Sequence, residues 1–121
     1  MGLDTYATNK KYEIDLTPEQ LRAFEEADIQ LFGGMISGHV GSFRGKVYQQ
    51  IIYKITGEDL YKFYIPPAKT KKIYRALAAC DPQKAAEETE ALGGVNPLGI
   101  IELRKFFKVC TDYELGLIGS W

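Results

Sequence analysis

The residues best suited to binding chemistry lie in one glycine-rich segment, GGMISGHVGSFRGK at residues 33–46. Glycines allow backbone N–H groups to turn toward one point, and a helix that starts directly after them favours an anion there. The Walker A phosphate loop is absent, because Gly41 and Gly45 are one residue too close and Val47 stands where the motif needs a hydroxyl. The segment therefore predicts either a general anion site or a tight turn that allows close packing.

Within this segment Arg44 is the candidate charge anchor. In a helix that begins at about residue 42, steps of four and seven place Arg44 on the same side as Tyr48 and Ile51, which is apolar. A cation in the first turn of a helix costs roughly 0.3–1 kcal/mol, and burying it without a partner costs more. An anion should therefore lie close to Arg44, either an internal carboxylate such as Asp4 or Asp112, or an external group. The candidate ligand-binding residues are the charged, hydroxyl and glycine residues around it: Ser37, Gly38, His39, Gly41, Ser42, Arg44 and Lys46.

The first functional hypothesis is a small binding module that uses these residues to hold a carboxylate of a partner protein or a small anionic ligand. The second is a small hydrolase or transferase, because His39, the chain's single histidine, lies between Ser37 and Ser42. No G-x-S-x-G nucleophile motif is present, and one histidine does not supply a typical zinc site. We therefore assign no catalytic residue, no metal and no cofactor.

The third hypothesis is a structural homo-oligomer. The chain has eight tyrosines, and the stretch YKFY at residues 61–64 concentrates two of them. Tyrosine and tryptophan are favoured at interfaces because they bury a large area and keep a polar group. Tyr61, Tyr64 and Trp121 are thus candidates for a partner surface, including that of a homodimer.

Composition narrows the class of protein. The 121 residues suit one domain, residues 1–121, and the net charge of −1 does not favour nucleic-acid binding. No apolar run approaches the roughly 18 residues of a membrane span, and the first residues lack a signal-peptide pattern. Tyr6 replaces the Ser or Thr that a myristoylation motif needs. We expect a cytoplasmic protein without a membrane partner, in which Cys80 and Cys110 are small buried residues rather than a disulfide.

Local signals predict the elements that must position these residues. Thr17 and Gln20 form a capping box at the start of a helix over residues 18–28, and a helix from about residue 42 to 55 should end at Gly57. Prolines at 67, 82 and 97 open three more helices. Residues 2–7 and 115–121 are predicted to be strands, which we expect to pair with each other. Residues 29–32 are predicted to be a shorter strand, and residues 60–65 a short strand or a packed loop. The expected class is α+β: about five helices packed with a small sheet that includes N- and C-terminal strands.

Several stretches together resemble a group of short uncharacterised bacterial proteins: MGLDTYA at the start, GSFRGKVY, ITGEDLY and IPP in the middle, and GLIGSW at the end. The likeness covers nearly the whole chain. It implies a compact bacterial single domain and assigns no activity, cofactor, partner or functional residue. The group's pattern has a further glycine at the position of His39, which speaks against a catalytic role for that residue.

Overall fold

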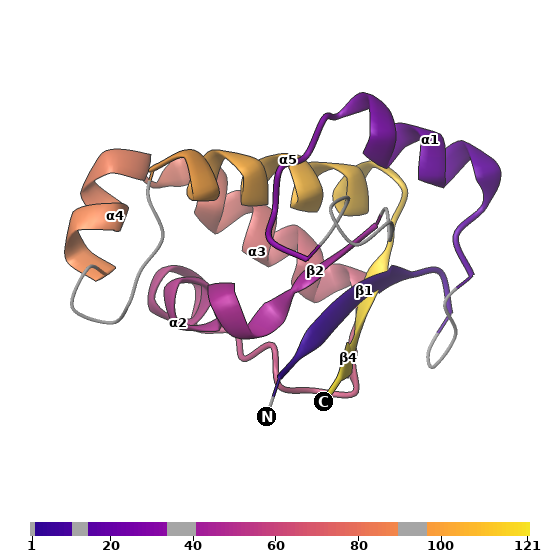
Figure 1. Cartoon of the computed structure of the whole chain (residues 1–121), viewed down its shortest axis with the longest axis horizontal. Coiled ribbons are helices and arrows are strands. Elements are labelled where there is room, and N and C mark those ends of the chain that lie inside the picture. The colour runs from indigo at the N-terminus through magenta and orange to yellow at the C-terminus, as the bar shows by residue number, and fades with distance from the viewer. Residues whose placement is uncertain (1, 11–14, 34–40, 90–96) are drawn as a thin grey trace.

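The computed structural model describes residues 2–10, 15–33, 41–89 and 97–121, and it confirms the expected α+β class. Within these ranges the chain forms five helices and a four-stranded antiparallel sheet that includes the N- and C-terminal strands (Figure 1). The elements in chain order are β1 (Asp4–Thr8), α1 (Pro18–Glu26), β2 (Ser42–Arg44), α2 (Gly45–Thr56), β3 (Tyr64–Ile65), α3 (Pro67–Ala79), α4 (Pro82–Thr89), α5 (Pro97–Asp112) and β4 (Gly116–Ser120).

The sheet has the order β2-β1-β4-β3, so the first and last strands lie at its centre. Asp4 pairs with Arg44 on one side and with Ser120 on the other. Because successive side chains of a strand point to opposite faces, Thr5 and Ala7 enter the core, while Asp4 and Tyr6 lie on the outer face and are less buried.

Helices α2, α3 and α5 gather on one side of the sheet, and α4 lies at the end of the molecule far from the strands (Figure 1). Phe43 of β2 lies at the centre of a group of aromatic rings in the core. Its ring centroid lies 4.9 Å from that of Phe106, 6.2 Å from that of Phe107 and 5.7 Å from that of Tyr48. Helix α5 turns one apolar face to this core, and its members Ile100, Leu103, Phe107 and Cys110 are all fully buried.

The first helix confirms its capping signal. Gln20 donates its backbone N–H to the Thr17 hydroxyl at 3.2 Å, and the Thr17 N–H donates to the Gln20 side chain at 2.9 Å. Helix α1 ends at Glu26, two residues before the predicted end, where Asp28 takes a positive φ of 51°. The buried Phe24 of this helix packs on Phe106, with ring centroids 5.0 Å apart.

One predicted helix begins three residues later than expected, and one predicted strand does not form. Residues 42–44 do not begin the helix but form β2, because their backbone pairs with β1 and their side chains alternate with Phe43 inward. Residues 29–32 form no strand: Ile29 and Leu31 are buried, but they sit in an irregular segment whose Phe32 carbonyl accepts one hydrogen bond from the Arg44 N–H at 2.7 Å. In both places tertiary contacts decide the conformation rather than the local apolar pattern.

Gly45 lets the start of α2 approach β1 closely. An added Cβ at Gly45 would lie 2.3 Å from Thr5 Oγ1 and 2.8 Å from Leu3 Cδ2. The Lys46 N–H donates to the Leu3 carbonyl at 3.2 Å across the same approach. Together these contacts fix the position of Arg44 at the end of β2. No helix in the described ranges is both long enough and apolar enough to cross a membrane.

Replacing Gly45 with alanine should lower the free energy of unfolding by about 1–3 kcal/mol in urea denaturation, because the new methyl overlaps Thr5 and Leu3. Without this overlap, alanine in a helix would instead stabilise the protein by up to about 1 kcal/mol. The sign of the change therefore tests the close approach. In a Thr5→Ala background the cost of Gly45→Ala should shrink, and an equal cost in both backgrounds would contradict the contact.

Candidate functional site

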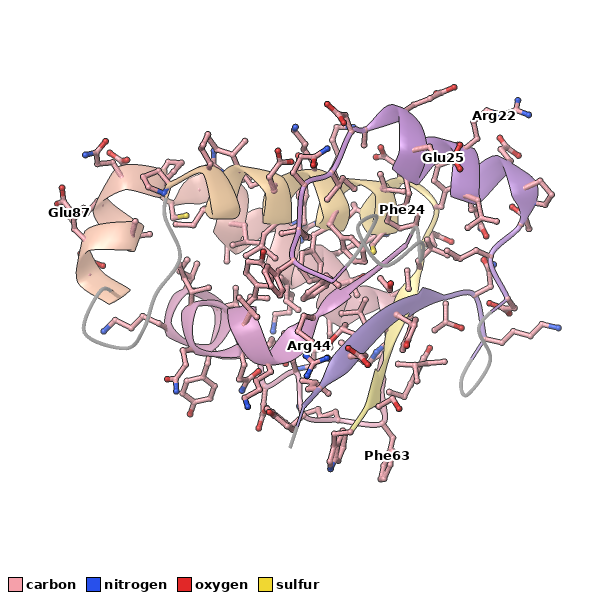
Figure 2. All side chains as sticks on the ribbon, viewed as in Figure 1. Arg22, Phe24, Glu25, Arg44, Phe63 and Glu87 are labelled. Carbon is pink, nitrogen blue, oxygen red and sulfur yellow. The ribbon has the colours of Figure 1, made fainter. Side chains whose placement is uncertain are left out.

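A hollow lies at the edge of the sheet, on its outer face, next to Arg44. Its volume is about 260 Å³. The lining residues come from β1, from β2 and from the irregular segment that follows α1; they are Asp4, Tyr6, Phe32, Gly33, Ser42, Phe43 and Arg44. In Figure 2 the Arg44 side chain lies beside β1, near the end of the sheet where that strand begins.

Arg44 is placed by two elements at once. It is the last residue of β2 and the N-cap residue of α2, with an extended backbone at φ −77° and ψ 94°. Its position is therefore outside the first helical turn, and its side chain follows the strand's alternation to the outer face instead of joining the apolar face of α2. This corrects the helical placement expected from the sequence.

An internal carboxylate does lie beside Arg44. Its Nη1 atom is 3.5 Å from Asp4 Oδ1, and the two side chains are 43% and 48% exposed. Within the described residues no hydrogen bond to the guanidinium accompanies this ion pair. The other carboxylate considered, Asp112, pairs instead with Lys108 at 2.9 Å. Because exposed pairs of this kind contribute about 0–1 kcal/mol, Asp4 holds Arg44 only weakly.

Glycines on both sides allow this placement. An added Cβ at Gly2 would lie 2.3 Å from Arg44 Nη2, so the guanidinium lies directly against that glycine. An added Cβ at Gly33 would lie 3.0 Å from the Arg44 Cβ, and Gly33 has a positive φ of 80°. The side chain is thus confined between Gly2 and Asp4, with one side open to the hollow.

Tyr48 stabilises the segment that forms one side of the hollow. Its hydroxyl accepts a hydrogen bond from the Phe32 N–H at 2.9 Å, which ties the segment carrying Phe32 and Gly33 to helix α2. Burial raises the pKa of Tyr48 above its usual value, although the Phe32 N–H acts in the opposite direction. The phenol therefore stays neutral at neutral pH, and its oxygen acts here as a hydrogen-bond acceptor.

The structure brings together only part of the predicted site. Ser42 and Arg44 both line the hollow. Gly41 does not: it is buried with a φ of 83°, and an added Cβ would lie 2.5 Å from Leu16 Cδ1. Lys46 is exposed, and its side chain does not line the hollow. The remaining predicted residues, Ser37, Gly38 and His39, lie outside the described residues.

Four lining residues were not predicted from the sequence, and Asp4 was predicted only as a possible partner of Arg44; the four are Tyr6, Phe32, Gly33 and Phe43. A usable signal existed for Tyr6, because alternation along β1 places it on the same face as Asp4. No local signal existed for Phe32, which reaches the hollow through its backbone bond to Arg44. Among the described residues, no group of three or more His, Cys, Asp or Glu side chains could hold a metal ion.

The two cysteines are free thiols in different surroundings. Cys110 is fully buried in the core, and this burial raises the pKa of its thiol far above the usual value. Cys80 is partly buried at the end of α3, where its Sγ donates to the Leu77 carbonyl at 3.2 Å. It borders a cavity of about 630 Å³ between α2, α3 and α4.

The fold and the hollow define this chain as a small α+β domain with one charged site at the edge of its sheet. No protein family model, no curated protein and no solved structure matches the chain. The resemblance to short bacterial proteins therefore stays a prediction, and the function has to be argued from the site itself.

We expect Cys110 to resist thiol reagents in the native protein. A disulfide reagent at about pH 8 should modify Cys80 in the wild type, and the Cys80→Ser variant should react roughly a hundredfold more slowly, since Cys110 reacts only after the core opens. Unfolding in guanidinium should expose both thiols. Fast labelling of native Cys80→Ser would contradict this expectation.

Because the pKa of Cys110 is raised in the folded state, its contribution to stability is complete below about pH 8.5, the pKa of a free thiol. This contribution is lost as the pH rises above that value toward the pKa of the folded state.

Proposed function

We propose that the protein is a small binding module in which Arg44 receives a carboxylate of a partner protein at the hollow beside β1. The observation that carries the proposal is the loose ion pair: Nη1 of Arg44 lies 3.5 Å from Asp4, and both side chains are about half exposed. A guanidinium has five N–H donors and prefers two parallel bonds to a carboxylate. Asp4 supplies no such pair, so an entering carboxylate would gain it.

Asp4 also determines which anions fit. Its negative charge beside Arg44 lowers the positive potential in the hollow, which disfavours a free inorganic anion. A polypeptide segment offers a carboxylate together with neutral N–H groups, from which Asp4 can accept hydrogen bonds. The net charge of −1 supplies no broad positive field to attract small anions either. These points favour a protein partner over a free anionic ligand.

The rim of the hollow suits the same kind of ligand. Ser42 and Tyr6 line it as well, and Phe32, whose side chain is well exposed, offers an apolar contact next to the charged pair. Helix α2 has no acidic residue in its first turn that would repel an approaching carboxylate. The hollow therefore offers a charged pair and an apolar contact side by side.

The alternative of a small hydrolase or transferase requires Ser37 or Ser42 to act with His39. Ser37 and His39 lie outside the described residues, and no observation in the described part of the chain favours this reaction. It therefore stays a prediction from the sequence, as does the cytoplasmic location.

The binding site can be tested with acetate and with an N-acetylated, glutamate-containing tripeptide as probes, followed by NMR of the arginine Nε–H signals. We expect the Arg44 signal to shift on addition of each probe and the peptide to bind more tightly than acetate. The Arg44→Ala variant should lose this binding. The matched control is Arg75→Ala, since Arg75 is an exposed arginine on α3, far in sequence from the hollow.

Removal of the competing charge gives the sharper result. The Asp4→Asn variant should bind acetate about five- to tenfold more tightly than the wild type, because a negative charge 3.5 Å from Arg44 is lost. Its stability should change by at most about 1 kcal/mol. If acetate fails to shift the Arg44 signal even in Asp4→Asn, the guanidinium is not a carboxylate site and the proposal is wrong.

A further inference from the structure

Arg44 and Asp4 stand opposite each other in the ladder between β2 and β1. Hydrogen-bonded and non-hydrogen-bonded pairs alternate along an antiparallel ladder, and the Ala7 N–H donates to the Gly41 carbonyl at 2.8 Å. By this alternation Asp4 and Arg44 form a non-hydrogen-bonded pair, the kind in which opposite side chains lie closer together. The strand pairing thus keeps the two charges next to each other on the outer face.

In the free protein these two charges compensate each other, since Arg44 Nη1 lies 3.5 Å from Asp4 Oδ1. Among the described residues that line the hollow, they are also the only charged side chains. The lining therefore has no net charge, and it attracts a free anion or a free cation only weakly. Selectivity arises when a ligand takes one member of the pair away from the other.

A carboxylate bound to Arg44 changes this balance. The guanidinium then has two negative neighbours, Asp4 and the carboxylate of the ligand, and the hollow carries one excess negative charge. Because Asp4 is 48% exposed, water and salt weaken the repulsion between the two carboxylates without abolishing it. Neutral N–H groups of the ligand can donate to Asp4, but they do not restore the missing positive charge. A cation does both.

We propose that the segment received by the hollow carries a basic side chain beside its acidic one, so that the carboxylate binds Arg44 and the cation binds Asp4. This partner chemistry rests on the carboxylate binding proposed above. The partner then presents a glutamate or aspartate next to a lysine or arginine on the same side of the segment. The four charges alternate in sign across the hollow, and each has an opposite neighbour.

The size and the rim of the hollow agree with such a pair of side chains. Its volume of about 260 Å³ lies just below the roughly 300–1,000 Å³ of pockets that enclose a drug-sized molecule, so it accommodates the ends of side chains. Phe32 lines the same hollow and is 63% exposed. Its side chain offers an apolar surface for the CH₂ groups of a lysine or arginine whose charged end reaches Asp4.

Blocked tripeptides test the role of the cation. In an extended segment, side chains two positions apart point to the same side. The probes are therefore acetylated and amidated glutamate–alanine–lysine, the reverse order lysine–alanine–glutamate, and the counterparts with glutamine in place of lysine. In at least one order the lysine peptide should bind roughly three- to tenfold more tightly than its glutamine counterpart, measured by titration of the Arg44 Nε–H signal.

The Asp4→Asn variant locates the contact of the cation. In this variant the advantage of the lysine peptide should disappear, while the glutamine peptide should bind more tightly than it does to the wild type. The matched control is Asp112→Asn on α5, because Asp112 is an aspartate of similar exposure, 52%, in another ion pair. This control should keep the full advantage of the lysine peptide, and thermal melts of both variants verify folding.

Equal affinities of the lysine and glutamine peptides for the wild type overturn the inference but leave carboxylate binding at Arg44 in place, since both peptides still shift its signal. An advantage that persists in Asp4→Asn also overturns it, because the cation then binds elsewhere. If no peptide shifts the Arg44 signal, and acetate fails to do so even in Asp4→Asn, the proposed function itself is wrong and the inference falls with it.

Discussion

The pairing of β1 with β4 at the centre of the sheet is the constraint on which the rest of the structure depends. The two strands run in register from Asp4 opposite Ser120 to Thr8 opposite Gly116, and thus join the beginning and the end of the described chain. Closing so long a loop costs entropy, although the cost grows only slowly with length. Burial of Ala7 and Leu117 on the inner face offsets it. Strand β2 is then positioned by β1, so the hollow beside Arg44 is a consequence of this one pairing.

At the described positions glycine serves close packing, which is one of the two roles that the sequence pattern predicts. A glycine-rich segment before a helix predicts backbone amides directed at an anion. In the described residues, Gly41, Gly45 and Gly119 are instead the places where another part of the chain comes too close for a Cβ: Leu16, Thr5 and the Lys62 backbone respectively. Such close contacts explain how a small domain can pack its helices tightly on a narrow sheet.

The elements that were predictable are those with a local physical cause. Thr17 and Gln20 cap α1 through their own side chains, and prolines fix the first turns of α3, α4 and α5. Strand β2 was not predictable, because its three residues are extended only through hydrogen bonds to β1 and one to Phe32. The same limit applies to the site. Arg44 was recognisable in the sequence as a charge among apolar positions. Phe32 and Gly33, in contrast, line the hollow only because of tertiary contacts, which no local pattern indicates.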